Sequence, residues 1–246
     1  MFRHKGKNRT FSHNLRLATL LSFVAGIVNV SGVLGLKTLT TNVTGHFAFF
    51  AEKILLQEYS AAITFFVFTV FFLLGAFTSN FTSEIMLRIA PKYSHVIPIG
   101  LEFCILFCVG FFGQESEIIT VSGRIIAFSL LFAMGIQNSL VTKISLSTVR
   151  TNHLTGLFTD LGIELSQLFF YKKLEEKKKL KTSIYLRLSI ITFFFIGCVL
   201  GGFIYQKIQL KTLLVASVFL LIALFYDYLR FKFFVIKRKK VSNRKL

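Results

Sequence analysis

Acidic side chains inside apolar runs are the residues of this chain best suited to carry chemistry. Asp160 and Glu102 are the two strongest cases, and Glu52 and Glu164 are two more. A carboxylate within a membrane segment is costly to insert and commonly marks a proton or ion pathway. We therefore predict Asp160 and Glu102 as coupling groups. The alternative is a structural ion pair with a basic side chain, such as Lys53, Arg124 or Lys143, and it is favoured for Glu52 and Glu164.

Two amides occupy comparable apolar surroundings in the two halves of the chain. Asn29 and Asn138 each lie three residues after a glycine, Gly26 and Gly135. A buried amide needs hydrogen-bond partners, because an unpaired polar group in hydrocarbon is strongly unfavourable. One interpretation places both amides at a substrate site near the membrane midplane. The other makes them interhelical hydrogen bonds, worth about 1 kcal/mol each.

A Thr-Gly pair opens the polar segment that follows each amide. These pairs are Thr44-Gly45 and Thr155-Gly156, and Arg150 precedes the second pair. A threonine can cap the free N–H groups of a helix start, where the helix dipole favours an anion or a substrate carboxylate. A simple cap beside a close helix crossing is the alternative. The full hypothetical substrate-binding set is Asn29, Thr44, Gly45, Asn138, Arg150, Thr155 and Gly156.

The sequence carries no recognisable enzyme motif. It contains no Walker loop, no Gly-x-Ser-x-Gly elbow, no His-Glu-x-x-His and no spaced set of metal ligands. We therefore expect no enzyme activity, no cofactor and no metal. An integral membrane enzyme that uses Asp160 with His153 or His46 on a lipid-derived substrate is the least favoured of three functional hypotheses.

The elements that must hold these residues form two sets of similar motifs. The run from Phe23 to Asn29 is echoed by Phe132 to Asn138, about one hundred residues later. The run from Phe71 to Ala76 is echoed by Phe193 to Cys198. An internally duplicated membrane bundle is typical of many transporters, whose two halves rock about a site between them.

The composition requires a membrane. Of 246 residues, 54% are hydrophobic and 31 are Phe, which is more apolar surface than a soluble domain of this size can hide. The formal net charge is +18. Most basic residues lie in three clusters beside apolar segments, at 3–16, 172–187 and 230–245, as the positive-inside rule expects. We therefore expect contact with anionic lipids at the cytoplasmic face and no nucleic-acid binding.

Eight apolar segments can be marked, and their charges decide the topology. They cover about 17–36, 43–57, 60–80, 95–113, 122–142, 154–171, 184–206 and 211–231. The second and sixth are short and charged, so we expect re-entrant or interior half-helices there. The other six would span an all-α transmembrane bundle with both termini in the cytoplasm. Three spans per half would make the repeat inverted; eight spans remain the alternative.

This topology divides the chain into five regions. They are a basic cytoplasmic N-terminus (1–16), a first transmembrane repeat (17–113), an external acidic loop (114–121), a second repeat (122–231) with a lysine-rich cytoplasmic loop (172–183), and a basic cytoplasmic tail (232–246).

The motifs also carry a family resemblance. The run from Phe132 to Asn138, followed by Arg150 to Asp160, resembles the YoaK-type family of bacterial inner-membrane proteins, and the first half is similar to the same family over Phe23 to Gly45. The resemblance covers roughly 15–230 and implies a multi-pass protein of a bacterial inner membrane, with no established activity. This chain departs from the family pattern at Asn29, where an acidic residue is frequent, and at His46, where Asn is frequent.

Three functions are compatible with these features. A small-solute transporter or permease with a site between the repeats is favoured. A non-transporting scaffold or lipid-interacting protein comes second, and the membrane enzyme third. The sequence predicts an unidentified small-molecule ligand for the first of these, and gives no indication of the oligomeric state.

Overall fold

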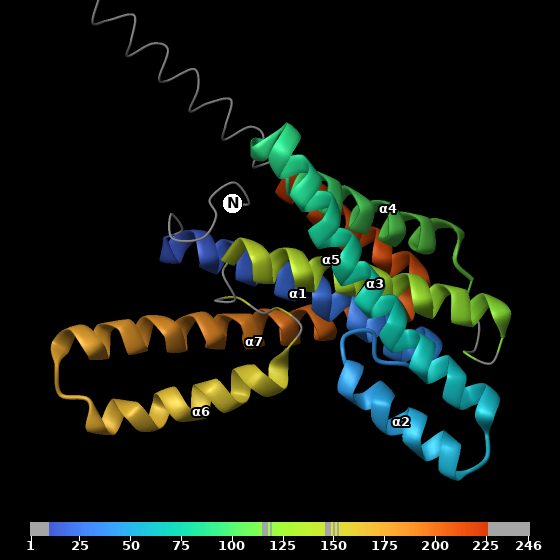
Figure 1. Cartoon of the computed structure of the whole chain (residues 1–246), viewed down its shortest axis with the longest axis horizontal. Coiled ribbons are helices and arrows are strands. Elements are labelled where there is room, and N and C mark those ends of the chain that lie inside the picture. Colours follow the sequence, from blue (N-terminus) through green and yellow to red (C-terminus); the bar gives the residue numbers. More distant parts are fainter. Residues whose placement is uncertain are drawn as a thin grey trace, which may run out of the picture.

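The chain folds into a bundle of helices (Figure 1). The computed structural model describes residues 10–114, 118, 120–145, 149, 151 and 153–225, and no strand occurs among them. The elements are α1 (Phe11–Leu36), α2 (Val43–Leu55), α3 (Tyr59–Ile89), η2 (Pro91–Tyr93), α4 (Val96–Phe112), α5 (Val121–Ser145), α6 (Leu154–Phe170), α7 (Leu174–Ile208) and η3 (Gln209–Lys211), followed by helical residues 212–225. The predicted all-α class is confirmed.

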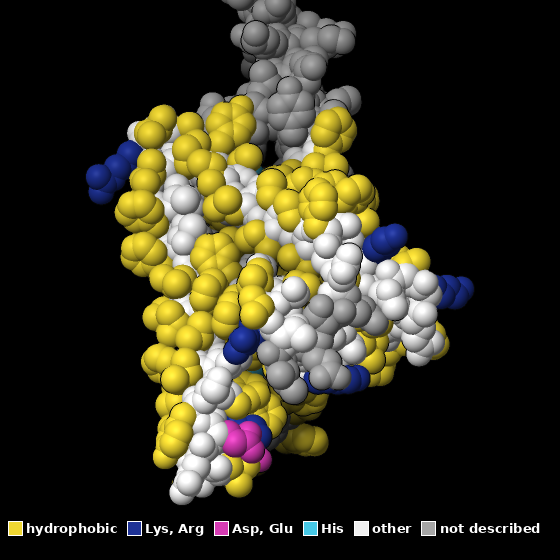
Figure 2. Space-filling model, turned by 90° about the vertical axis from the view of Figure 1, so that its right-hand side faces the viewer, with side chains coloured by type: hydrophobic (Ala, Val, Ile, Leu, Met, Phe, Trp, Pro, Cys, Tyr) yellow, Lys and Arg dark blue, Asp and Glu magenta, His cyan; other side chains and the backbone are white. Residues whose placement is uncertain are grey.

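Four helical runs are long and apolar enough to cross a membrane. They are Phe11–Leu36, Tyr59–Ile89, Val121–Ser145 and Leu174–Phe225, while α4 is apolar but shorter. The last run is interrupted at Gln209, whose φ of 54° and ψ of −136° break the helix. Figure 2 shows hydrophobic side chains over most of one outer face, as expected of a surface in contact with lipid. The protein is therefore a membrane protein.

Two helices form the centre of the bundle. In both α1 and α5, 61% of the most apolar stretch is buried, against 22% in α3. Leu17, Leu21 and Val28 of α1 and Leu130 and Met134 of α5 are fully buried. The outer helices α3 and α7 pack against these two. Both candidate amides, Asn29 and Asn138, therefore lie on the central helices.

Glycines set the closest helix contacts, and each contact joins one half of the sequence to the other. A Cβ added at Gly26 of α1 would overlap the Phe194 carbonyl oxygen of α7, and one at Gly197 would overlap the Phe23 carbonyl oxygen. Gly75 of α3 and Gly135 of α5 meet in the same way, against the carbonyl oxygens of Phe132 and Phe72. Such small residues let helix backbones approach closely in lipid.

The two pairs of crossing helices each run in parallel. At one end of the α1–α7 pair, the rings of Phe11 and Tyr185 lie 5.9 Å apart, and towards the other end Gly35 lies against the Tyr205 hydroxyl. In the α3–α5 pair, Phe71 stacks on Phe128 at 4.7 Å and, farther along, Lys143 pairs with Glu84 at 2.7 Å. A third close approach joins Gly110 of α4 to the backbone of Leu214.

The lysine-rich segment differs from its prediction. A loop is expected at 172–183, but α7 begins at Leu174 and includes residues 174–183. Glu175 and Glu176 lie in its first turn, where negative charge complements the helix dipole. The α6–α7 and α2–α3 hairpins project at opposite ends of the molecule (Figure 1).

Candidate substrate site

The chain turns back toward the bundle after α1. The segment 37–42 is not helical, and its Thr41 hydroxyl donates to Asn29 Oδ1 at 2.9 Å. Asn29 lies seven residues before the end of α1, about 10 Å along the axis at 1.5 Å per residue. A Cβ added at Gly32 would lie 2.5 Å from the Thr40 side chain, so the returning segment packs directly on α1. The first half therefore brings irregular backbone beside its buried amide.

Two described residues after α5, Val149 and Thr151, also lie back against that helix. The fully buried Gln137 amide of α5 donates from Nε2 to Thr151 Oγ1 at 3.2 Å and to the Leu21 carbonyl oxygen of α1 at 3.0 Å. Farther out, the Ser145 hydroxyl and the Val149 backbone are joined by hydrogen bonds of 3.0 and 3.3 Å. Gln137 thus connects Thr151 and its own helix to the central helix of the other half.

Unused acceptors remain beside this junction. Within the described residues, Gln137 Oε1 and Asn138 Oδ1 are buried and have no hydrogen-bond partner. Two more buried hydroxyls have no hydrogen-bond partner in the described residues, that of Ser22, next to Leu21 in the chain, and that of Thr40, beside Gly32 in the first returning segment. Amide oxygens accept hydrogen bonds or coordinate cations. The arrangement is suited to a ligand that offers N–H or O–H groups, or to a monovalent cation.

The two Thr-Gly pairs lie in the first turns of α2 and α6, but neither threonine caps its helix. Asn42 is the N-cap of α2, and its Oδ1 accepts from Gly45 N at 3.0 Å. His153 is the N-cap residue of α6 and makes no side-chain cap. The predicted threonine caps are therefore wrong, because in each case the residue two positions earlier occupies the cap. Arg150 lies outside the described residues.

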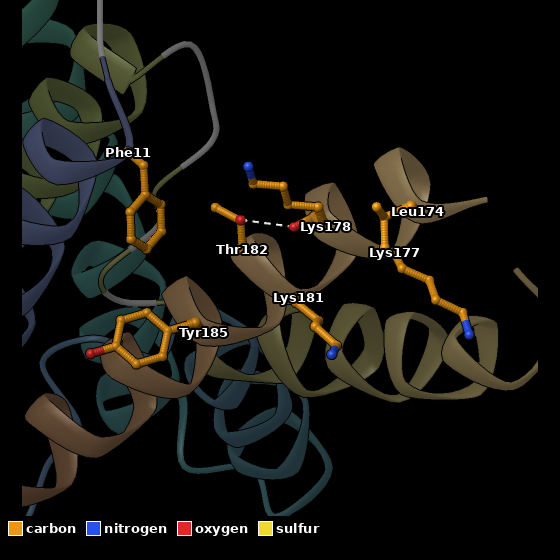
Figure 3. A pocket seen from close by; sticks show the side chains of 7 residues that line it. All are labelled: Phe11, Leu174, Lys177, Lys178, Lys181, Thr182 and Tyr185. Carbon is orange, nitrogen blue, oxygen red and sulfur yellow. Dashed lines mark hydrogen bonds between the residues drawn. The ribbon is translucent and has the colours of Figure 1, made fainter. Parts of the chain in front are cut away.

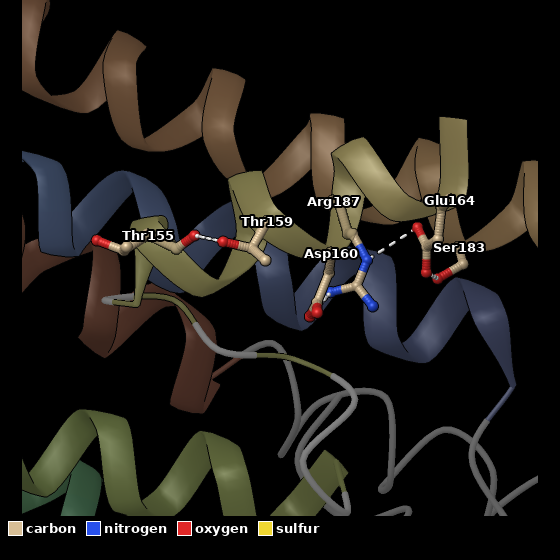
Figure 4. Close-up of polar contacts among 6 residues, drawn as sticks. All are labelled: Thr155, Thr159, Asp160, Glu164, Ser183 and Arg187. Atoms are coloured by element: carbon tan, nitrogen blue, oxygen red, sulfur yellow. Dashed lines mark hydrogen bonds and ion pairs between the residues drawn. The ribbon is translucent and has the colours of Figure 1, made fainter. Parts of the chain in front are cut away.

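Asp160 is held in an ion-pair cluster between α6 and α7 (Figure 4). Arg187 Nη1 lies 2.8 Å from Asp160 Oδ2, and Arg187 Nε lies 2.9 Å from Glu164 Oε2. Ser183 donates to the other Glu164 oxygen at 2.6 Å. Neither acid pairs with the basic residues that the sequence suggests, since Lys53 pairs with Glu58 and Lys143 with Glu84. The cluster fastens α6 to α7.

Glu102 has a different environment. It is fully buried on the inner face of α4, which also carries Ile99, Leu106 and Gly110. Both of its side-chain oxygens lack a hydrogen-bond partner within the part of the chain that the structure describes. The structure does not bring Glu102 to the Gln137 junction by any hydrogen bond, so it stays a separate candidate.

His46 closes the first returning segment. Its Nε2 donates to the Leu39 carbonyl oxygen at 2.7 Å, and its ring packs against Phe65 and Phe68 with centroids 6.1 and 5.1 Å away. Burial lowers the pKa of His46, and the hydrogen bond to Leu39 opposes that shift. The neutral ring therefore joins α2, α3 and the returning segment. Among the described residues, no group of three His, Cys, Asp or Glu side chains could hold a metal ion.

The sequence pattern of one family extends over this whole arrangement. The family is described as protein of unknown function (DUF1275), and its pattern matches residues 17–226. The chain belongs to the DUF1275 family. No curated protein and no solved structure gives a match to it. The family thus agrees with the resemblance found in the motifs and assigns no activity to this DUF1275 protein.

Three residues at these junctions were not predicted as site residues. Gln137 adjoins Asn138 in the repeated motif, yet Asn138 alone was singled out because Asn29 corresponds to it. Thr151 and Arg187 become recognisable only when the returning segment and the α6–α7 hairpin are in place. A buried glutamine next to a repeated asparagine is the signal that could have identified Gln137.

Proposed function

We propose that this DUF1275 protein is a small-solute transporter or permease of the bacterial inner membrane, with its site beside Asn29, Gln137 and Asn138. The observation that carries this proposal is the return of segment 37–42 to Asn29 and of the residue Thr151 to Gln137. Irregular backbone at membrane depth is tolerated where it is buried in protein or lines a polar cavity. Broken helices of this kind form substrate sites in secondary transporters.

The helix directions support an inverted repeat of six spans. Because α2 is short, α3 would return across the membrane and run opposite to α1. The helix α5 is parallel to α3, so it also runs opposite to its counterpart α1. The six spans would be α1, α3, α4, α5, α7 and the segment that begins at residue 212. The glycine contacts, which exchange partners between halves, support the same pseudo-two-fold arrangement.

The unused acceptors indicate the class of solute. A solute that carries N–H or O–H donors, or a monovalent cation, would satisfy the buried oxygens of Gln137 and Asn138. An anion carries acceptors and no donors, so it would leave the oxygens of Gln137 and Asn138 without hydrogen-bond partners. We therefore favour a neutral polyol, an amine or an alkali cation. The proposal involves no enzymatic step.

The test is a ligand screen on the purified full-length protein. Tight binding to the folded state raises the apparent melting temperature by mass action. We expect at least one polyol, amine or alkali cation to stabilise the wild type and not Asn138→Ala, and to be moved across proteoliposomes by the wild type. The control is Ser166→Ala, which alters a small polar residue on the exposed face of α6. If the ligand stabilises Asn138→Ala as much as it stabilises the wild type, the binding site does not include Asn138. Binding without flux would favour a non-transporting scaffold.

A further inference from the structure

A hollow lined by lysines lies where the start of α7 meets the start of α1 (Figure 3). Its volume is about 500 Å³, and it is lined by Phe11, Leu174, Lys177, Lys178, Lys181, Thr182 and Tyr185. The rings of Phe11 and Tyr185 close one end, and Leu174 lies at the other (Figure 3). A second hollow of about 680 Å³ shares Phe11, Lys178 and Thr182, and adds Lys179 and Glu175.

The positive charge of this hollow is not neutralised by neighbouring acids. Asp160 and Glu164 are occupied by Arg187, and Glu176 lies 3.6 Å from Lys173. Among the described residues, Lys177, Lys178 and Lys181 form no ion pair. Of the described residues that line the two hollows, Glu175 alone is acidic. The lysines therefore remain available for an external anion.

An exposed apolar stripe continues from the lysines along the same face of α7. Residues 181, 185, 188, 195 and 199 are spaced so that they share one side of the helix. Tyr185, Leu188, Phe195 and Val199 are all exposed on it. An acyl chain could lie along this stripe while the lysines hold the charge above it.

If the apolar stripe marks the hydrocarbon, the lysines lie at the outer side of the headgroup layer, within reach of a phosphate. Lys181 lies about 10 Å from Leu188 along the helix axis, and the headgroup layer of one leaflet is roughly 5 to 8 Å thick. The aliphatic stem of a lysine packs on apolar surface while its ammonium reaches the phosphate level. Phe11 and Tyr185, whose rings lie 5.9 Å apart, would then lie at the boundary, where aromatic side chains are enriched.

We propose that this hollow is a binding site for the phosphate headgroup of an anionic phospholipid, with an acyl chain along the exposed stripe of α7. Lys177, Lys178 and Lys181 would contact the phosphate. The corresponding end of the other hairpin lacks this chemistry, because the hollow of about 700 Å³ there is lined by a single basic residue, Arg124, together with Glu58. The inference is independent of the transport proposal.

The experiment compares two matched double variants of the full-length protein in detergent. Lys177→Gln/Lys181→Gln removes two charges from the hollow. Lys207→Gln/Lys211→Gln removes two exposed charges far from it, one at the opposite end of α7 and one in η3. Phosphatidylglycerol is titrated against a phosphatidylcholine background, and the melting temperature is followed. Retained lipid is counted by native mass spectrometry.

We expect phosphatidylglycerol to stabilise the wild type and the Lys207/Lys211 variant equally. In the Lys177/Lys181 variant, half-saturation should need about 30-fold more lipid, which corresponds to roughly 1 kcal/mol for each lysine. Soluble glycerol phosphate should have no comparable effect, since it lacks the acyl chain. An unchanged titration in the Lys177/Lys181 variant, or an equal loss in both variants, would overturn the site. Equal stabilisation by glycerol phosphate would assign the hollow to a soluble phosphate instead.

Discussion

Buried polar side chains of this bundle are tied to backbone carbonyls that lie far along the chain or in a returning segment. Gln137 bonds to the Leu21 carbonyl oxygen and His46 to that of Leu39. A carbonyl of an irregular segment has no helical partner, so a side-chain donor prevents the cost of leaving it unpaired. His46 therefore stabilises the segment 37–42 at which the chain re-enters the bundle, whereas Gln137 bonds to a helical residue of α1 and joins the two central helices.

The protonation of His46 should make folding stability depend on pH. Its pKa is lowered by burial from an ordinary value of 6.5, so the unfolded chain binds a proton more readily. The contribution of the neutral His46 ring to folding stability is complete above pH 6.5. It is lost as the pH falls from there toward the lowered pKa, because the unfolded chain then takes up the proton first. We expect the midpoint of denaturant unfolding in micelles to decrease over this interval in the wild type. In His46→Gln the slope should be reduced, and in His153→Gln it should be retained. An unchanged slope in His46→Gln would contradict the role of His46.

The amides show what sequence can and cannot reveal at this scale. The repeat identifies Asn29 and Asn138 as paired polar positions, and the structure places both on the central helices. The repeat in the sequence does not reveal that Gln137 makes the longer-range contacts, because the contact to Leu21 spans 116 positions. A hydrogen bond of that separation depends on which helices become neighbours, and no local pattern encodes it.

At the scale of elements, two pairs of glycines fix how closely the helices approach. Gly75 and Gly135 allow α3 and α5 to cross with their backbones in contact, and Gly26 and Gly197 do the same for α1 and α7. Van der Waals packing is a main source of helix association in lipid, so backbone proximity contributes directly to stability.

Alanine substitution should separate crossing glycines from other glycines. Gly75→Ala places a Cβ against the Phe132 carbonyl oxygen, a backbone atom that cannot move away easily. We expect a loss of about 1 to 3 kcal/mol in the free energy of unfolding. Gly162→Ala of α6 is the control, since nothing lies within 4 Å of its added Cβ, and helix propensity should leave it neutral or up to ~1 kcal/mol more stable. Reversible unfolding in mixed micelles measures both, and equal effects would contradict the crossing.

The α6–α7 hairpin depends on Arg187 in a comparable way. Arg187→Gln would break both ion pairs and leave Glu164, whose side chain is only 13% exposed, without its charged partner. Because the cluster is partly solvated, we expect a local cost of about 1 to 2 kcal/mol. Amide hydrogen exchange in α6 should accelerate roughly tenfold, while α2 is unaffected. Arg124→Gln serves as the control, and unchanged exchange in α6 would show that the ion pairs do not hold it.

The sequence predicts the positions of the helices better than it predicts where each helix begins and what it packs against. Each of the eight predicted apolar segments overlaps a helix, because apolar run length is a strong signal in membrane proteins. The lysine-rich segment was expected as a loop since it has no apolar stripe. It is helical because it extends α7 beyond the apolar core and packs against α6, with Leu180 and Ile184 beside Leu161. That contact depends on the hairpin, so local periodicity does not show it.

For the molecule as a whole, the two hairpins project from opposite ends, and six spans would place them on opposite sides of the membrane. With both termini in the cytoplasm, the α6–α7 turn would face the cytoplasm and the α2–α3 turn would face outward. Leu174 and Leu55 are 84% and 83% exposed, one near each turn, so a cysteine at either position should meet water or the interface.

The orientation can be tested with these two positions in intact and permeabilised bacterial cells. An impermeant maleimide should label Leu55→Cys in intact cells and Leu174→Cys only after permeabilisation, because the lysines at 177–181 keep their hairpin inside. The unmodified protein, with its own Cys104, Cys108 and Cys198 in apolar helices, gives the background. Labelling of both positions in intact cells would contradict six spans. Both turns would then lie on the same side, which requires an even number of membrane crossings between them, whereas six spans place α3, α4 and α5 there. Labelling of Leu174→Cys alone in intact cells would keep the fold and reverse its orientation, which the clustering of basic residues at that end opposes.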